Sequence, residues 1–303
     1  MGSQTRSTLI AVAVLLGLFA AGTYVAFELV TDRGLPLVPS PGRVAVVPVE
    51  GTLSADRGVA EALRRYREDG SVEGVVLKIQ SPGGTVGATQ AAYRELRALR
   101  DEGRPVVAWI GDVGASGGYY AAVAADSIFA LPGSITGSIG VIMQFPNLEG
   151  TLDRIGLRMD VVKSGALKDA GSPYRALGED DREVFRRLVD DAYGQFVDAV
   201  AEGRGLEPER ARELADGRVV SGERAVELGL VDGVSTFSEA LDAAGRMSGL
   251  GEDPRTVTPR EGRFDLLDLL DGVSRSRIEG WVESWLGWSP GRGGAPRLLY
   301  LWR

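Results

Sequence analysis

From Arg43 onward, short segments rich in β-branched residues alternate with segments of helical spacing. Strands joined by crossover helices form a parallel sheet, and sites in such sheets lie at strand ends. The sequence therefore predicts an α/β fold with a largely parallel sheet enclosed by helices. The expected strands are 44–49, 72–79, 105–110, 127–131 and 159–163. The expected helices are 58–69, 84–100, 119–125, 180–203, 207–215, 222–228 and 235–248.

The composition excludes several classes of site and partner. The chain has 303 residues, of which 44% are hydrophobic, enough for one sizeable domain with appendages. It has neither histidine nor cysteine, which excludes disulfides, thiol catalysis and the usual zinc sites, so no metal or cofactor is expected. Its 42 acidic residues outnumber its 34 basic residues, so a nucleic-acid partner is not expected.

An apolar N-terminal segment determines the expected topology. Thr8–Phe27 carries no charge over 20 positions, close to the roughly 20 residues that a membrane-spanning helix needs. Arg6 precedes this segment and acidic residues follow it, which places the N-terminus in the cytoplasm and the body of the protein outside. The alternative is a cleaved signal peptide, since Phe19–Gly22 offers small residues. The apolar run continues past them, which favours an uncleaved, single-pass anchor in the cell membrane.

The same patterns divide the chain into five parts. A proline-containing linker separates the anchor from the α/β domain. Beyond that domain, Phe264–Trp288 has the spacing of an amphipathic helix, and an apolar tail, Pro296–Arg303, follows it. The expected parts are a cytoplasmic N-terminus (1–7), an anchor (8–30), a linker (31–42), the α/β domain (43–248) and a C-terminal helix with its tail (249–303).

Ser116 lies in Gly114-Ala115-Ser116-Gly117-Gly118, where an apolar helix is expected to begin. A serine among small residues at a helix N-terminus presents its hydroxyl beside free backbone N–H groups, which stabilise developing negative charge. The G-x-S-x-G pattern normally indicates an α/β-hydrolase with a histidine base. Because the chain has no histidine, an activated serine needs another base, and a lysine is the main alternative.

A glycine turn, Ser81-Pro82-Gly83-Gly84, follows the second expected strand and precedes a helix. Glycines at such a position leave backbone N–H groups open to an incoming carbonyl oxygen, as an oxyanion hole requires. Such a turn alone more often only reverses the chain. Followed by a glycine-flanked serine at a helix start, it supplies the second half of an acyl-transfer site.

The chain has three lysines, and one is the best candidate for the base. Lys78 lies within an expected strand and Lys163 ends one. Lys168 instead lies in a loop of small residues, 164–171, that can fold over a site. A lysine amine accepts a proton only when it is neutral, which requires burial. If the carboxylate of Asp169 points the same way, it stabilises the charged form of the Lys168 amine and opposes this role. The alternative interpretation of Lys168 is a solvated surface lysine.

Four ordered segments resemble the signal peptide peptidase A family of serine proteases: SPGG (81–84), GASGGYYAA (114–122), GSITGSIGV (133–141) and KSGALKD (163–169). A further block, 217–232, is also similar. The resemblance implies a Clp-protease-like or crotonase-like fold. It also implies a role for each of five residues: Ser116 as nucleophile, Lys168 as general base, Ser138 as the group that orients the lysine, and the Gly84 and Gly117 N–H groups as oxyanion donors.

The resemblance further implies a membrane-anchored homo-oligomer that cleaves remnant signal peptides and other membrane-proximal polypeptides. Other interpretations remain. A related group of Clp-like membrane proteases carries additional membrane spans, and no second long apolar stretch occurs in this chain. A crotonase-type hydratase shares the glycine loops but does not need the lysine. A non-catalytic scaffold or peptide-binding module with the same fold is the alternative from a different functional class.

Overall fold

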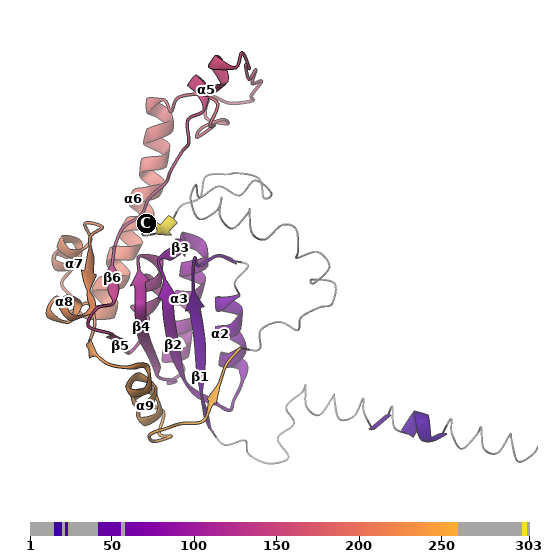
Figure 1. Ribbon diagram of the computed structural model, residues 1–303, viewed down its shortest axis with the longest axis vertical. Coiled ribbons are helices and arrows are strands. Elements are labelled where there is room, and N and C mark those ends of the chain that lie inside the picture. The colour runs from indigo at the N-terminus through magenta and orange to yellow at the C-terminus, as the bar shows by residue number, and fades with distance from the viewer. Residues whose placement is uncertain (1–14, 20–21, 24–41, 56–57, 260–298, 302–303) are drawn as a thin grey trace, which may run out of the picture. The chain divides into compact units, whose positions relative to one another are not determined.

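The computed structural model describes residues 15–19, 22–23, 42–55, 58–259 and 299–301 (Figure 1). The chain divides into two compact units, 1–41 and 42–303, and the second contains the α/β domain. Its elements are, in order, β1 (Arg43–Glu50), α2 (Val59–Glu68), β2 (Val72–Ser81), β3 (Gly83–Thr85), α3 (Val86–Asp101), β4 (Val106–Ala115), α4 (Gly117–Ala122), β5 (Ser127–Ala130), β6 (Ile135–Gly137), α5 (Glu149–Arg154), α6 (Glu179–Arg204), α7 (Pro208–Leu214), β7 (Val219–Ser221), α8 (Gly222–Glu227), β8 (Gly233–Val234), α9 (Phe237–Met247), β9 (Thr256–Val257) and β10 (Leu299–Leu301).

Eight strands of the described chain form one mostly parallel sheet, which confirms the predicted α/β class. The main order is β7-β6-β4-β2-β1-β9, with β5 beside β4 and β8 beside β5. The β6–β7 pair is antiparallel and the other pairs in this sheet are parallel. Because β4 pairs with both β2 and β6, the chain segments that follow these three strands meet at one edge of the sheet.

The central strands β1, β2 and β4 are buried on both faces of the sheet, and this explains why they read as nearly continuous apolar runs. In β1, Ala45 and Val47 join a large cluster that includes Leu63 of α2 and Phe196 of α6. Their neighbours in β1 join a second cluster on the other face, against Ala240 of α9. Successive side chains of a strand point to opposite faces, so both faces of a central strand need apolar residues.

The prediction of a strand over 159–163 is wrong. These residues are irregular, and every residue from 153 to 168 is exposed. Val161 and Val162 favour extended backbone, but a strand is stable only when another strand pairs with it. No strand pairs with this segment within the described part of the chain.

Several predictions concern residues that the structure does not describe. No helix among the described residues is both long and apolar enough to cross a membrane. Most of the predicted anchor (8–30) and linker (31–42), and the predicted amphipathic helix (264–288), lie outside the described ranges. Of the expected C-terminal tail, residues 299–301 are described and form β10.

Asp232 connects the helical layer to the sheet. Its carboxylate accepts a hydrogen bond from the Ile128 backbone N–H of β5 at 2.7 Å. It also accepts two from the Arg204 guanidinium of α6, at 2.7 and 3.0 Å. Burial by itself raises the pKa of Asp232, but the hydrogen bonds from Arg204 and Ile128 outweigh it, so the pKa lies below its ordinary value. The folded state therefore favours the ionised carboxylate.

Replacing Asp232 with alanine is expected to lower the free energy of unfolding by about 2 kcal/mol at neutral pH, because the nearly buried Arg204 loses its partner. The pKa of Asp232 is depressed in the folded protein. The difference in the free energy of unfolding between wild type and variant should therefore be largest above about pH 3.9, the pKa of an aspartate in the unfolded chain. It should disappear as the pH falls through the pKa of Asp232 in the folded protein. Urea denaturation at neutral and acidic pH measures it. Glu213→Ala, which removes an exposed ion pair with Arg210, is the control and should change little. Equal effects of the two substitutions would contradict the assignment.

Candidate active site

Ser116 lies at the sharp turn between β4 and α4. Its backbone has φ of 51° and ψ of −115°, a conformation that residues other than glycine rarely adopt. The Ser116 N–H donates to the Gly137 carbonyl at 2.8 Å, and its own carbonyl accepts from Tyr120 N–H at 2.8 Å. These bonds hold a strained, buried serine at the N-terminus of a helix, a type of strain that is concentrated at functional sites.

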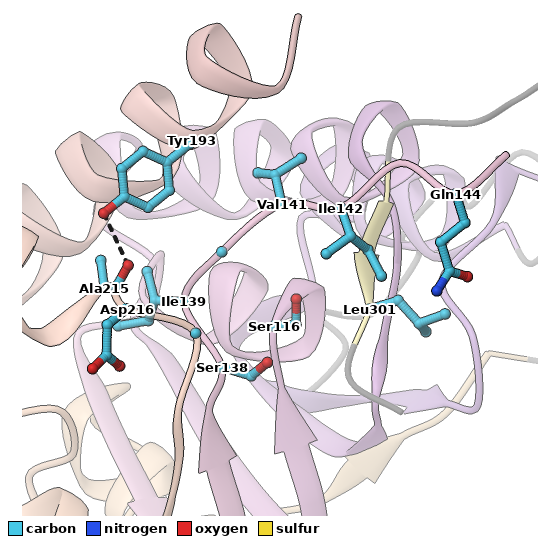
Figure 2. A pocket seen from close by; sticks show the side chains of 12 residues that line it. Ser116, Ser138, Ile139, Val141, Ile142, Gln144, Tyr193, Ala215, Asp216 and Leu301 are labelled. Atoms are coloured by element: carbon cyan, nitrogen blue, oxygen red, sulfur yellow. Dashed lines mark hydrogen bonds between the residues drawn. The ribbon is translucent and has the colours of Figure 1, made fainter. Parts of the chain in front are cut away.

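Ser138 lies beside Ser116 because their strands are neighbours. β4 and β6 run parallel with Ala115 opposite Gly137, so each serine directly follows one member of that pair. Ser138 also has a positive φ, of 52°, and its N–H donates to the Arg218 carbonyl at 2.7 Å. Both serines face the same cavity (Figure 2). The structure thus brings the predicted nucleophile and the predicted orienting serine together.

The cavity has a volume of about 540 Å³ and a mainly apolar wall on one side of the two serines. Figure 2 shows this wall, which the segment after β6 and the C-terminal strand supply. Such a wall suits an extended peptide with apolar side chains. The lining residues are Ser116, Ser138, Ile139, Gly140, Val141, Ile142, Gln144, Tyr193, Ala215, Asp216, Gly217 and Leu301.

The glycine turn after β2 packs directly against the start of α4. Gly83 has φ of 116°, which requires glycine. A Cβ on Gly84 would lie 2.0 Å from the Leu53 carbonyl oxygen, so no side chain fits there. The Gly84 nitrogen lies 3.0 Å from the point where a Cβ on Gly117 would be. The structure therefore places the two predicted oxyanion donors, Gly84 and Gly117, next to each other, with Gly117 adjoining the nucleophile.

Ser81 holds this glycine turn in place. Its buried hydroxyl donates to the Gly51 carbonyl at 2.6 Å and accepts from the Gly83 N–H at 3.1 Å. A hydroxyl that bonds both to its own turn and to a neighbouring segment limits the movement of the turn. The serine of the SPGG segment thus has a structural role that its sequence position alone does not reveal.

Lys168 is not among the residues that line the cavity. It is exposed, in the segment between α5 and α6, which lies at the end of α6 that points away from the sheet (Figure 1). Its neighbour Asp169 accepts from Arg175 at 3.0 Å and from Lys163 at 2.6 Å, and these two bonds lower the pKa of Asp169. Asp169 is therefore engaged by other cations. The structure does not bring Lys168 of a chain to Ser116 of that chain.

The titratable groups that line the cavity are poor candidates for the base. The hydrogen bond from the Arg218 side chain lowers the pKa of Asp216 to about 2, so this carboxylate is too weak a base to activate a serine. The Tyr193 hydroxyl donates to the Ala215 carbonyl at 2.9 Å (Figure 2). Neither residue was identifiable from the sequence, because only the tertiary fold brings α6 and the segment after α7 to this cavity. Among the described residues that line the cavity, neither titratable group is therefore a good candidate base.

Comparisons with known proteins identify the family of the chain. A sequence model of peptidase family S49 matches residues 98–250. The chain is 37% identical to the Synechocystis protein named "Putative protease slr0021", over 85% of this chain and 96% of that protein. It is 33% identical to Protease 4 of Haemophilus influenzae, over 70% of this chain and 36% of that protein. It is 30% identical to the chloroplastic serine protease SPPA of Arabidopsis thaliana, over 80% of this chain and 38% of that protein. The chain belongs to peptidase family S49, the signal peptide peptidase A family that its motifs resemble.

Proposed function

We propose that this S49 peptidase is a serine endopeptidase with Ser116 as its nucleophile and Lys168 as its general base. The observation that carries the proposal is the position of Ser116. It is buried and strained at a helix N-terminus, beside Ser138 and next to two glycines whose N–H groups can bind an oxyanion. A Clp-protease-like or crotonase-like fold would account for a parallel sheet whose strand ends carry both glycine segments.

The reaction follows from these groups. Neutral Lys168 takes the proton of the Ser116 hydroxyl while Oγ forms a bond to the peptide carbonyl carbon. The Gly84 and Gly117 N–H groups stabilise the resulting oxyanion. The carbon–nitrogen bond then breaks, and the Lys168 ammonium returns the proton to the leaving amine. Water hydrolyses the acyl-enzyme and regenerates the serine. Ser138 accepts a hydrogen bond from the lysine and orients it.

Lys168 reaches this site from a second copy of the chain. Six large apolar side chains between Ile155 and Leu167 are exposed, and Val162 is fully so. Exposed apolar surface of this kind marks an interaction site. The same segment carries Lys168, and the Ser116 cavity of the chain lacks a base. A homo-oligomer in which this segment docks on a neighbour explains both observations, and it would also supply the partner that residues 159–163 need to pair as a strand.

The expected substrates are remnant signal peptides and other membrane-proximal polypeptides, bound in extended form. The proposed location is the cell membrane, with residues 8–30 as a single-pass anchor, the N-terminus in the cytoplasm and the catalytic domain outside. The apolar run Thr8–Phe27 supports this proposal. Membrane fractionation of the full-length chain, followed by protease treatment of intact cells, tests both the anchoring and the orientation.

One observation favours the alternative, a non-catalytic peptide-binding scaffold. Lys168 is exposed and outside the cavity, as it would be in a protein that needs no base. Labelling the full-length chain with a serine-directed fluorophosphonate decides between the two. The peptidase proposal requires labelling at Ser116 that disappears in Ser116→Ala. A folded, oligomeric chain that is neither labelled nor able to cleave peptides would favour the scaffold.

The lysine base also predicts a pH dependence. Only the neutral amine accepts the serine proton, so kcat/KM is expected to rise from about pH 6 into the alkaline range and then level off. A histidine cannot cause this rise because the chain has none. The measurement is a pH profile of cleavage of a quenched fluorescent peptide, with circular dichroism at each pH as the control for folding. A rate that falls over this range in a folded protein would rule out the lysine base.

A further inference from the structure

A cluster of charged side chains, centred on Arg175, holds the turn that carries Lys168. The Arg175 guanidinium donates to both carboxylate oxygens of Asp169, from Nη2 to Oδ1 at 3.0 Å and from Nε to Oδ2 at 3.2 Å. It also donates to the Asp181 carboxylate, from Nη2 at 3.1 Å and from Nη1. Asp181 lies in the first turn of α6. Arg175 therefore ties the residue that follows Lys168 to the start of a long helix.

Lys163 holds the same turn from its other end. Its ammonium donates to Asp169 Oδ1 at 2.6 Å and to the Ala166 carbonyl at 2.9 Å. The side chains of Asp169 and Asp181 are only 13% and 5% exposed, so salt screens their ion pairs less than it screens pairs on the open surface. The backbone on both sides of Lys168 is therefore fixed by charge-assisted hydrogen bonds.

The cluster occupies both oxygens of Asp169 with cations other than Lys168. The hydrogen bonds from Arg175 and Lys163 lower the pKa of Asp169, so this group is a carboxylate at neutral pH. Within the part of the chain that the structure describes, the Lys168 amine forms no ion pair. A free carboxylate beside a lysine favours the ammonium form, which cannot take a proton from serine. The two ion pairs of Asp169 remove this obstacle.

We propose that Arg175 is a positioning residue for the base: it ties Asp169 to α6 and so keeps that carboxylate away from the Lys168 amine. This inference rests on the proposed function, because it concerns the base of that reaction. Arg175 acts through Asp169 and does not itself touch the substrate. A lysine cannot fully replace Arg175, because only the planar guanidinium bridges two carboxylates with several parallel hydrogen bonds.

The other charged groups near the base are engaged elsewhere or exposed. Glu149 of α5 accepts a hydrogen bond from the Ala176 N–H at 2.9 Å. At the Ser116 cavity, Asp216 pairs with Arg218. Solvent screens the charged side chains that flank the cluster along the chain, because all of them are exposed. They are Arg158, Asp160, Glu179, Asp180 and Arg182.

A pH profile of full-length Arg175→Gln, with a quenched fluorescent peptide, tests the role of Arg175. Asp169 is then free to pair with Lys168, so the pH at which kcat/KM reaches half of its plateau should rise by about one unit. On the rising part of the profile kcat/KM should fall about tenfold, while the plateau stays close to that of wild type. If Arg175 only stabilised the fold, the whole profile would fall by a constant factor at an unchanged midpoint, and the proposal would be overturned.

Two more variants show whether Arg175 acts through Asp169. Arg175→Gln/Asp169→Asn has no carboxylate to pair with the lysine, so its midpoint should return to the wild-type value. Arg175→Lys keeps one cation and should shift the midpoint upward by less than Arg175→Gln, which also provides the test if the glutamine variant does not fold. Arg187→Gln is the matched control, because it breaks an exposed ion pair with Glu183 on the same helix and should leave the midpoint unchanged. A midpoint that stays high in the double variant would contradict the role of Asp169.

An NMR titration separates this inference from the proposed function. The chain has three lysines, so labelling with ε-¹³C-lysine gives three side-chain signals, and Lys168→Arg identifies the one that belongs to Lys168. In full-length Ser116→Ala, which cannot hydrolyse peptides, adding Arg175→Gln should move the Lys168 titration upward by about one pH unit. This shift, with no hydrolysis by wild type, would retain the role of Arg175 and reject the peptidase mechanism. Hydrolysis that depends on Ser116 and Lys168, without the shift, would reject the role of Arg175 alone.

Discussion

Co-expressing full-length Ser116→Ala and Lys168→Ala chains is expected to restore peptidase activity that neither variant has alone. Each single substitution removes one member of the proposed dyad and should lower kcat by roughly 10⁴-fold. In a mixed oligomer whose sites combine Ser116 of one copy with Lys168 of its neighbour, about one quarter of the sites contain both residues. A dyad formed within one chain would leave every site incomplete, so the recovery measures where the lysine comes from.

The control for this experiment is co-expression of Ser116→Ala with the double variant Ser116→Ala/Lys168→Ala, which contains no intact serine and should stay inactive. Native mass spectrometry shows whether the two chain types have mixed. Mixed oligomers without recovered activity would contradict the proposed contribution of a second copy. If Ser116→Ala abolished activity and Lys168→Ala did not, the base would be a different residue.

The strands in the centre of the sheet were predictable because burial on both faces leaves a local sequence signature. β1, β2, β4 and β5 are runs of β-branched and apolar residues between turn residues, and the structure has a strand at each position. β3, β6 and β7 have three residues each, too few for a periodic pattern. Residues 159–163 have the propensity of a strand but no pairing strand within the described part of the chain, which is why propensity alone gave a wrong result there.

The sequence determines the positions of the two serines and two glycines of the candidate site better than it determines the position of Lys168. Ser116, Ser138 and the two glycines each follow a strand of one parallel sheet, so their strand positions alone imply a common edge. The location of Lys168 depends on the direction in which α6 extends, which no local pattern contains. The pairing of β10 with β3 joins segments more than 200 positions apart in the sequence, and only the tertiary fold reveals it.

Replacing Gly84 with alanine is expected to reduce kcat/KM by roughly 10²- to 10³-fold, the usual effect of losing one oxyanion donor. The added Cβ would lie 2.0 Å from the Leu53 carbonyl oxygen and 2.5 Å from its Cβ. Since Leu53 forms a bridge with Gly84, β3 has to move away from it. That movement carries the Gly84 N–H away from Gly117 and disturbs the edge of β3 with which β10 pairs. Both kcat and peptide binding should therefore suffer.

Gly87→Ala is the matched control, three residues along the chain. Gly87 is exposed in α3, and a Cβ on it would meet no atom within 4 Å. Because the added methyl group meets no atom, this variant should keep its activity. Because alanine has a higher helix propensity than glycine, the free energy of unfolding should rise by up to about 1 kcal/mol. Kinetics and urea denaturation of both variants make the comparison. Wild-type kinetics in a folded Gly84→Ala variant would show that Gly84 is not an oxyanion donor. An equal loss of activity in Gly87→Ala would mean that both changes act through the fold rather than through the oxyanion hole.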